Sequence, residues 1–318
     1  MATRPTLSSS ASASSGSKAD WLIFLALGFM WGSSYLFIKI AVDDFGTFTL
    51  VALRLAVGAA LLWAVIRMSG QKIPGSAAAY RHLAVMSILN IVLPFALITW
   101  AERSVDSALA AILTSVVPLF AVVLAPLFIA DEPLRINGIV GLAIGFVGVI
   151  VLTGAGLGTG NSNLLGEIAL LAASVSYAAG AVYSRRNIRG LPPMIPAVFQ
   201  VSFAFVISGV LALVLEHPWT ARPDLIAVGA IVWLGLLGSG LAYLAFFRLL
   251  GHWGATRTTG VAYLLPIVGI VLGFVVLSEP IDARTIVGTA LVIVGLALVN
   301  SRYGQQLVFG RGRAVAKP

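Results

Sequence analysis

The chain of 318 residues holds few side chains that could carry out covalent chemistry. It has no cysteine, which excludes disulfides, thiolate metal sites and cysteine nucleophiles. No Walker loop, HExxH zinc motif or GxSxG nucleophile elbow occurs in it. The three histidines, His82, His217 and His252, have no spacing that suits a metal, so we expect them at membrane interfaces. We therefore expect no enzymatic activity, no cofactor and no metal.

The composition indicates a membrane protein. Hydrophobic residues make up 59% and charged residues 10% of the chain, whereas soluble domains average about 45–50% and 25%. The mean hydropathy is +1.01. The net charge of +8 does not predict a nucleic-acid partner, because the basic residues are spread over the ends of apolar segments and form no single groove-reading element.

Ten apolar stretches follow one another from Trp21, each of about the 20 residues that a helix needs to cross a bilayer. They cover residues 21–40, 47–66, 83–101, 107–130, 136–154, 164–184, 195–215, 225–250, 260–277 and 285–300. We expect an all-α integral membrane protein with ten transmembrane helices. Residues 1–20 are polar and rich in Ser and Ala, which predicts a disordered tail, and 304–318 form a basic tail.

Basic residues near the ends of the spans predict the orientation. With the N-terminus inside, fifteen of the 20 Lys and Arg residues fall on the cytoplasmic side and four on the other, with Arg54 inside a span. Positively charged ends stay in the cytoplasm, so both termini are predicted to be cytoplasmic.

An internal repeat divides the chain into 21–154 and 155–303. Its landmarks, in order, are Pro118, Glu132-Pro133, Gly141 and Gly148 in the first half, and Pro266, Glu279-Pro280, Gly288 and Gly295 in the second. Each half holds five spans, an odd number, so the second half enters the membrane from the opposite side. We therefore expect two inverted five-helix repeats around a central cavity.

Inverted repeats are the usual construction of secondary transporters that work by alternating access. A channel with the same number of spans would need rings of charge or a carbonyl filter motif, and no TVGYG-like segment is present. The sequence thus predicts a carrier whose site lies between the two halves.

These residues resemble the drug/metabolite transporter superfamily in its EamA-type, ten-span form, over residues 20–303. The resemblance is carried by Trp31-Gly32-Ser33-Ser34, Lys39, Arg54, the repeat landmarks, the segment 238–243 and Gly254-Ala255-Thr256. It implies export of small metabolites across a bacterial inner membrane, with amino acids, purines and cationic drugs as candidates. Within the family the chain is similar to the YddG-like amino-acid exporters. Phe246 and Phe247 depart from the pattern, which has a Trp there.

The resemblance also implies that spans 3, 4, 8 and 9 surround the cavity and that spans 1, 2, 6 and 7 close it. Polar and aromatic residues of these spans are the substrate-binding candidates: Ser34, Tyr35, Asn90, Trp100, Ser115, Tyr177, Ser239, Tyr243 and Tyr263. Hydrogen bonding between helices is the alternative role for each. Arg54 either meets a substrate carboxylate or pairs with Asp43, Asp44 or backbone carbonyls, and pairing is the interpretation that we favour.

Three prolines inside spans each remove a backbone hydrogen bond of the helix and are candidate hinges: Pro94, Pro118 and Pro266. Glycines spaced four apart, as in Gly141 and Gly145, predict close helix packing within a monomer, with a weak dimer as the alternative. No acidic residue falls in the middle of a span, so the sequence favours a facilitative carrier. The rival functions are a proton-coupled multidrug or cation antiporter and a flippase for lipid-linked molecules. The expected partners are a small-molecule substrate and the bilayer.

Overall fold

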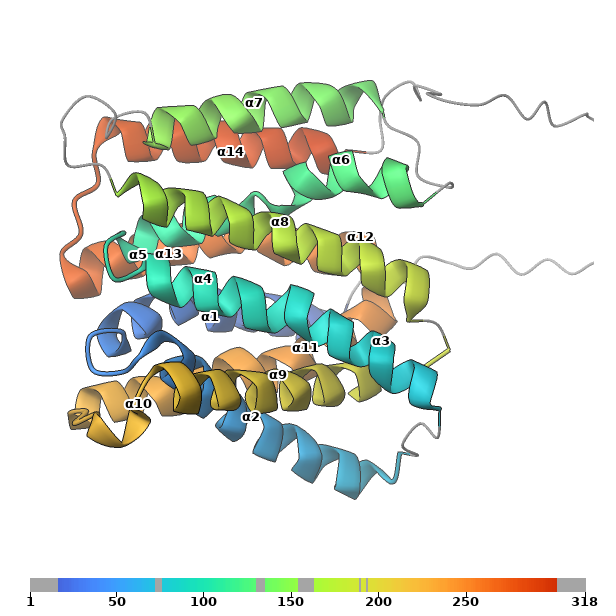
Figure 1. Ribbon diagram of the computed structural model, residues 1–318. Helices are drawn as coiled ribbons and strands as arrows, with labels where there is room; N and C mark the ends of the chain where they lie inside the picture. Colours follow the sequence, from blue (N-terminus) through green and yellow to red (C-terminus); the bar gives the residue numbers. More distant parts are fainter. Residues whose placement is uncertain are drawn as a thin grey trace, which may run out of the picture.

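The computed structural model describes residues 17–71, 76–129, 135–153, 163–188, 190–192 and 194–301, in which the elements are helices (Figure 1). The first half contains α1 (Lys18–Ala41), α2 (Thr47–Ser69), α3 (Ala77–Ser87), η1 (Ile88–Val92), α4 (Leu93–Ala101), α5 (Ser107–Ser115), α6 (Val117–Phe128) and α7 (Ile136–Thr153). The second half contains α8 (Leu164–Asn187), α9 (Met194–Leu215), η3 (Pro218–Thr220), α10 (Leu225–Trp233), η4 (Leu234–Leu241), α11 (Ala242–Trp253), α12 (Ala255–Thr258), η5 (Thr259–Tyr263), α13 (Leu264–Leu277) and α14 (Ala283–Asn300).

Ten helical segments in these residues are long and apolar enough to cross a membrane, which confirms the predicted all-α, ten-span fold. The third span begins at Ala77 rather than at residue 83, and the eighth continues to Trp253. Residues 1–16 of the predicted N-terminal tail, the tail 304–318 and the landmark Glu132-Pro133 lie outside the described residues.

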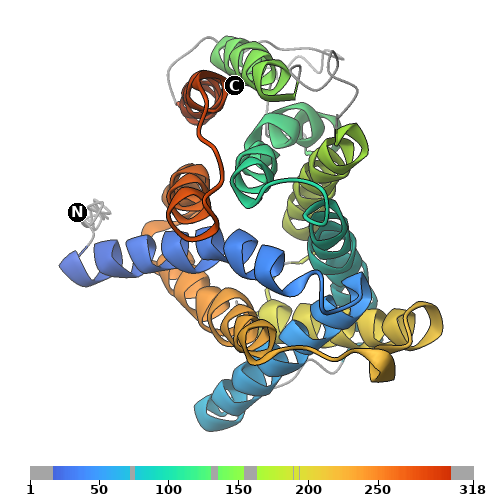
Figure 2. The same cartoon turned by 90° about the vertical axis from the view of Figure 1, so that its left-hand side faces the viewer.

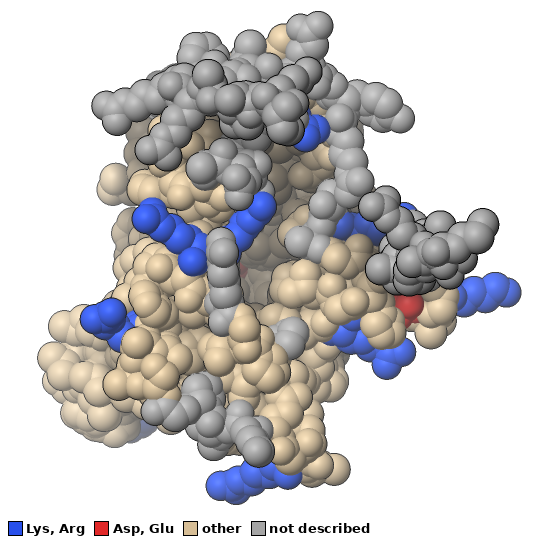
Figure 3. Space-filling model, turned by 90° about the vertical axis from the view of Figure 1, so that its right-hand side faces the viewer, with Lys and Arg blue, Asp and Glu red and all other residues tan. Residues whose placement is uncertain are grey.

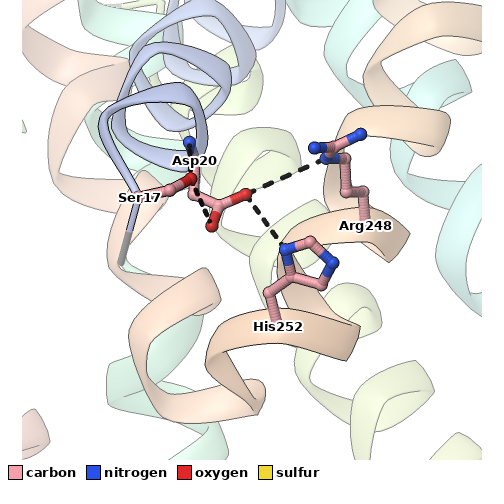
Figure 4. Close-up of polar contacts among 4 residues, drawn as sticks. All are labelled: Ser17, Asp20, Arg248 and His252. Atoms are coloured by element: carbon pink, nitrogen blue, oxygen red, sulfur yellow. Dashed lines mark hydrogen bonds and ion pairs between the residues drawn. The ribbon is translucent and has the colours of Figure 1, made fainter. Parts of the chain in front are cut away.

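The first helix begins at Lys18, earlier than the predicted start at Trp21, because local groups cap it. The Ser17 side chain accepts a hydrogen bond from the backbone N–H of Asp20 (3.2 Å), as an N-cap residue does. The Asp20 carboxylate lies 3.0 Å from His252 Nδ1 and 3.8 Å from Arg248 Nε (Figure 4). These contacts join the start of α1 to the end of α11.

Spans 3, 4, 8 and 9 are each built from more than one helical piece. Wider π-helical turns, η1 and η4, interrupt the third and eighth spans, and the fourth breaks at Val116 (φ −76°, ψ 4°). The ninth begins with the 3₁₀ turn η5. Pro94, Pro118 and Pro266 lie in the first turns of α4, α6 and α13, directly after such interruptions. A proline is tolerated there because the first turn has no intrahelical partner for its missing N–H.

The two halves pack as inverted repeats. The fifth span, α7, lies along the tenth, α14, and the second span, α2, lies along the seventh, α9 (Figures 1 and 2). The first span packs on α13 of the ninth, as the sixth span, α8, packs on α5 and α6 of the fourth. Equivalent spans thus make equivalent contacts, which is the arrangement that the repeat predicted.

The repeated glycines form the seam between α7 and α14. A Cβ placed on Gly141 would lie 2.6 Å from the carbonyl oxygen of Gly295, and one placed on Gly148 would lie 2.8 Å from that of Gly288. Only glycine allows this approach of two helix backbones. These landmarks of the sequence therefore serve packing within the chain, as predicted for the spaced glycines.

Candidate substrate-binding site

A cavity of about 610 Å³ lies between the two halves, within the size range of ligand-binding pockets. Side chains from all spans except the fifth and tenth line it. These are the eight spans that the resemblance places at the cavity, and the division into spans that surround it and spans that close it stays a prediction. The cavity is the candidate site.

The cavity is open at one end of the bundle, which we call the basic end, where α1 begins and α14 ends (right-hand side of Figure 1). Its lining reaches Arg185, which is exposed at the end of α8, and then Ile188 and Leu191. Figure 3 looks onto this end and shows Lys and Arg side chains around a hollow. The described part of the cavity lining includes two arginines and no carboxylate.

The cavity is closed at the opposite end by a packed seal. Tyr35, Ile38 and Ile98 line its floor and are 7%, 3% and 3% exposed. The hydroxyls of Tyr35 and Thr114 are 2.5 Å apart in a hydrogen bond that joins α1 to α5. Beyond this bond, the outer ends of α1, α2, α4 and α5 pack into one buried apolar cluster. In this conformation the cavity is therefore accessible from the basic end only.

Arg54 projects from α2 into the cavity and is 3% exposed. Its Nε donates a hydrogen bond to Ser239 Oγ (3.2 Å), and its guanidinium carbon lies 4.3 Å from the centre of the Phe95 ring. The predicted pairing with Asp43 or Asp44 is wrong: Asp43 is exposed, and Asp44 Oδ2 accepts from the backbone N–H of Asp224 (3.4 Å). Arg54 is too deep in α2 to reach the loop that carries both aspartates.

Seven of the predicted site residues line this one cavity: Ser34, Tyr35, Arg54, Asn90, Ser115, Tyr177 and Tyr243. Ser239 is fully buried behind the lining, where it holds Arg54. Asn90 and Gly238 come from the π-helical turns η1 and η4, so the two repeats contribute irregular backbone to the site at related positions. Their binding role stays a prediction.

Two predicted residues lie elsewhere. Trp100 is 46% exposed and points away from the cavity, because it follows the lining residue Ile98 by two positions, about 200° of helix rotation. The Tyr263 hydroxyl donates to the carbonyl oxygen of Leu296 (2.8 Å) and accepts from Asn300 Nδ2 (2.6 Å), which ties the ninth span to the tenth. Neither residue lines the cavity.

An aromatic wall of the cavity is not predicted by the sequence reasoning. Trp31 packs on Phe246, with ring centroids 5.5 Å apart, and Tyr243 stacks with Phe247 at 6.4 Å. All four rings line the cavity. In the sequence, Phe246 and Phe247 stand out only as departures from the family pattern. Their spacing, three and four residues after Tyr243, is the signal that places them on one face of α11.

Glu102 is buried in the seal, directly after α4. It is fully buried, and neither carboxylate oxygen has a hydrogen-bond partner among the described residues. Lys39 Nζ instead donates to the backbone oxygens of Glu102 (2.7 Å) and Val105 (2.9 Å). Burial raises the pKa of the Glu102 carboxyl well above its ordinary value, which the Lys39 ammonium opposes and Glu279 reinforces. Burial at this position therefore favours the protonated form of the Glu102 carboxyl.

The sealed conformation is expected to lose stability as the pH rises, because ionised Glu102 has no partner. The penalty is absent below the ordinary pKa of a glutamate and complete above the raised pKa of Glu102. In Glu102→Gln this titration is removed, so the melting temperature in detergent should fall less than that of the wild type as the pH rises above the ordinary pKa of a glutamate.

The matched control is Asp282→Asn, because the hydrogen bond from the Thr285 backbone N–H lowers the pKa of the Asp282 carboxyl, so Asp282 is already ionised where Glu102 begins to titrate. The melting temperature of Asp282→Asn should depend on pH as that of the wild type does. An equal dependence of the melting temperature on pH for Glu102→Gln and the wild type would contradict the assignment of Glu102 as a buried carboxyl with a raised pKa.

Comparison with known proteins gives the family. The EamA-like transporter family matches residues 18–154 and 164–301, one match for each half. The chain is 29% identical over 277 residues to the uncharacterized inner membrane transporter YedA of Escherichia coli (strain K12), which covers 86% of this chain and 88% of the relative. It is 28% identical over 309 residues to a probable terminal-alkyne amino-acid exporter of Streptantibioticus cattleyicolor, covering 95% and 98%.

A protein of known crystal structure has the same fold, with a TM-score of 0.64 and 23% sequence identity over 89% of this chain and 96% of that one. These findings confirm the resemblance to the EamA-type drug/metabolite transporters. The chain is a multi-pass membrane protein and belongs to the EamA-like transporter family.

Proposed function

We propose that the protein exports small organic metabolites, amino acids in particular, across a bacterial inner membrane by alternating access. The observation that carries this proposal is the cavity between two inverted repeats, open at the basic end and sealed at the other. If each repeat adopted the conformation that the other repeat has in this structure, the basic end would be sealed and the opposite end would open. The similarity to a probable terminal-alkyne amino-acid exporter supports the substrate class.

Orientation and coupling complete the proposal. The excess of Lys and Arg at the basic end supports a cytoplasmic position for this end and for both termini. Transport is facilitative, because no described cavity-lining residue is a carboxylate that could carry a proton or a cation from side to side. The same observation disfavours the alternative of a proton-coupled cation antiporter. The protein acts as a monomer or weak dimer.

Proteoliposomes with the purified protein and a panel of radiolabelled amino acids test this proposal, with no ion gradient imposed. We expect downhill movement of a subset of the panel and competition among its members. Movement that requires a proton gradient, or that is seen only with lipophilic cations, would favour the antiporter. Movement of a fluorescent lipid between leaflets would favour the flippase.

Replacement of Pro118 or Pro266 by alanine is expected to slow transport more than it lowers the folded yield. Both prolines directly follow an interruption of a span, where the backbone can bend, and a continuous helix would stiffen these points. Transport rate and monodisperse yield are measured on the same preparations. Pro126→Ala, inside α6 of the same span as Pro118, is the control. An equal loss of rate and yield at Pro118 and Pro266 would count against a hinge.

A further inference from the structure

The Arg54 guanidinium is a buried cation without an anionic partner. Of its five N–H donors, Nε binds Ser239 Oγ, and apart from the ring contact with Phe95 no other hydrogen bond or ion pair joins it to the residues that the structure describes. A buried charge without a partner is costly, so a protein retains one where a ligand supplies the opposite charge. Arg54 lines the cavity, which is where such a ligand would enter.

Arg54 and Ser34 meet at one wall of the cavity, against the backbone of Gly238. A Cβ placed on Gly238 would lie 3.2 Å from Arg54 Nη2 and 2.8 Å from Ser34 Oγ, so glycine allows both polar groups to pack against this backbone, and both residues line the cavity. Ser34 donates its own hydroxyl proton to the Met30 carbonyl oxygen (3.0 Å). At this wall the Ser34 oxygen is therefore an acceptor, whereas Arg54 is a donor.

The surroundings of Arg54 and Ser34 favour an anion with an apolar body. No described residue of the cavity lining is a carboxylate that could offset the charge of Arg54. The aromatic wall begins next to these two residues: Trp31 lies one turn of α1 before Ser34, and Tyr243 follows Gly238 in the same span. A solute whose charged end meets Arg54 would lay its body against these rings.

We propose that Arg54 binds the carboxylate of the transported solute, and that Ser34 Oγ accepts a hydrogen bond from an ammonium group beside it. A guanidinium holds a carboxylate through two parallel hydrogen bonds, a geometry that an ammonium does not offer. An α-amino acid carries both groups on one carbon, which suits a donor and an acceptor that lie close together at one wall of the cavity. This inference rests on the proposed function and assigns residues to its substrate.

The test compares three solutes that share one ring system: tryptophan, tryptamine, which lacks the carboxylate, and indole-3-propionate, which lacks the ammonium. Uptake of each into proteoliposomes is measured for the wild type, Arg54→Gln, Arg54→Lys and Gly238→Ala. The wild type is expected to favour tryptophan and indole-3-propionate over tryptamine by at least tenfold. Arg54→Gln should lower uptake of both carboxylates at least tenfold and leave tryptamine unchanged.

Two further variants separate binding from structure. Arg54→Lys keeps the charge without the paired donors and should give an intermediate loss. Gly238→Ala adds a methyl group that would lie 2.8 Å from Ser34 Oγ and 3.2 Å from Arg54 Nη2, so it keeps both residues but displaces their side chains, and it should lower tryptophan uptake as Arg54→Gln does. Gly209→Ala is its control, because a Cβ placed on Gly209 meets no atom within 4 Å.

The outcomes distinguish this inference from the proposed function. Unchanged tryptophan uptake in Arg54→Gln overturns the inference and leaves amino-acid export standing. Uptake of indole-3-propionate but of no amino acid by the wild type overturns amino-acid export and the ammonium contact with Ser34, and leaves the carboxylate site at Arg54 standing. An equal loss for all three solutes in Arg54→Gln and Gly238→Ala shows a structural role, and wild-type transport of none of them overturns the inference as stated.

Discussion

Gly295→Ala is expected to destabilise the folded protein by about 2–3 kcal/mol. A Cβ at this position would lie 2.6 Å from both the Gly141 carbonyl oxygen and the Gly145 backbone nitrogen. These are backbone atoms, so no side chain can move aside, and α7 and α14 must separate. Overpacked interiors lose about 1–3 kcal/mol, and backbone contacts of this kind place Gly295→Ala at the upper end of this range.

The measurement is the free energy of unfolding or the melting temperature in a mild detergent, and Gly209→Ala in α9 provides the matched control. Because a Cβ on Gly209 meets nothing within 4 Å, its effect should be neutral or stabilising by up to about 1 kcal/mol, the helix preference of alanine over glycine. Similar stability of the two variants would refute the close seam between the fifth and tenth spans.

Glu279→Gln is expected to shift the conformational equilibrium at least tenfold. The favoured conformation is the one in which the cavity is open at the end opposite the basic end. The Glu279 carboxylate is 8% exposed and accepts from the backbone N–H groups of Ser107 (2.8 Å) and Ala108 (3.0 Å). It thereby caps α5 from the loop between α13 and α14 and holds the seal together. A hydrogen bond to a charged group contributes about 1.5–3 kcal/mol, and tenfold corresponds to about 1.4 kcal/mol.

The readout is a single cysteine at Ile38, on the sealed floor of the cavity, treated with a membrane-impermeant maleimide. In the Glu279→Gln background, Ile38→Cys should react faster from the side opposite the basic end. Asp282→Asn is the control from the same loop, because Asp282 is exposed and caps only its own helix through Thr285 (2.7 Å). Equal labelling rates of Ile38→Cys with and without Glu279→Gln would mean that Glu279 does not hold the seal.

The ten spans and the repeat could be predicted because they depend on local properties of the chain. The length of an apolar stretch determines whether it crosses a bilayer, and the order of Pro118 and Gly141 against Pro266 and Gly288 gives the repeat directly. Most polar residues of the cavity were found for the same reason, since few polar side chains occur inside the spans.

The parts that could not be predicted depend on how distant segments meet. The capping of α5 by Glu279 joins residues 172 positions apart, and Glu216 similarly accepts from the N–H groups of Phe48 (2.8 Å) and Thr49 (2.8 Å) at the start of α2. The preference for a pairing of Arg54 with Asp43, Asp44 or backbone carbonyls rested on local charge and polarity alone. The structure instead places Arg54 against Ser239, which is 185 positions away, and the ring of Phe95.

The irregular turns also escaped prediction. The π-helical turns η1 and η4 contain no proline, and although η4 holds three glycines, Gly235, Gly238 and Gly240, closely spaced glycines in a span equally predict helix packing. They rotate the residues that follow, so the face of α4 that meets the cavity differs from that of a continuous helix. This is why Phe95 and Ile98 line the cavity and Trp100 does not.

The central claim is that one cavity between the repeats is exposed to the two sides of the membrane in turn. Because the chain has no cysteine of its own, single cysteines at Ala181, in the open cavity, and at Ile38 test it directly in oriented vesicles. Without substrate, Ala181→Cys should react with an impermeant maleimide from the side of the basic end only. With a transported amino acid present, Ile38→Cys should become reactive from the other side while Ala181→Cys is protected. Reaction of both positions from both sides at once would indicate a continuous pore and contradict alternating access.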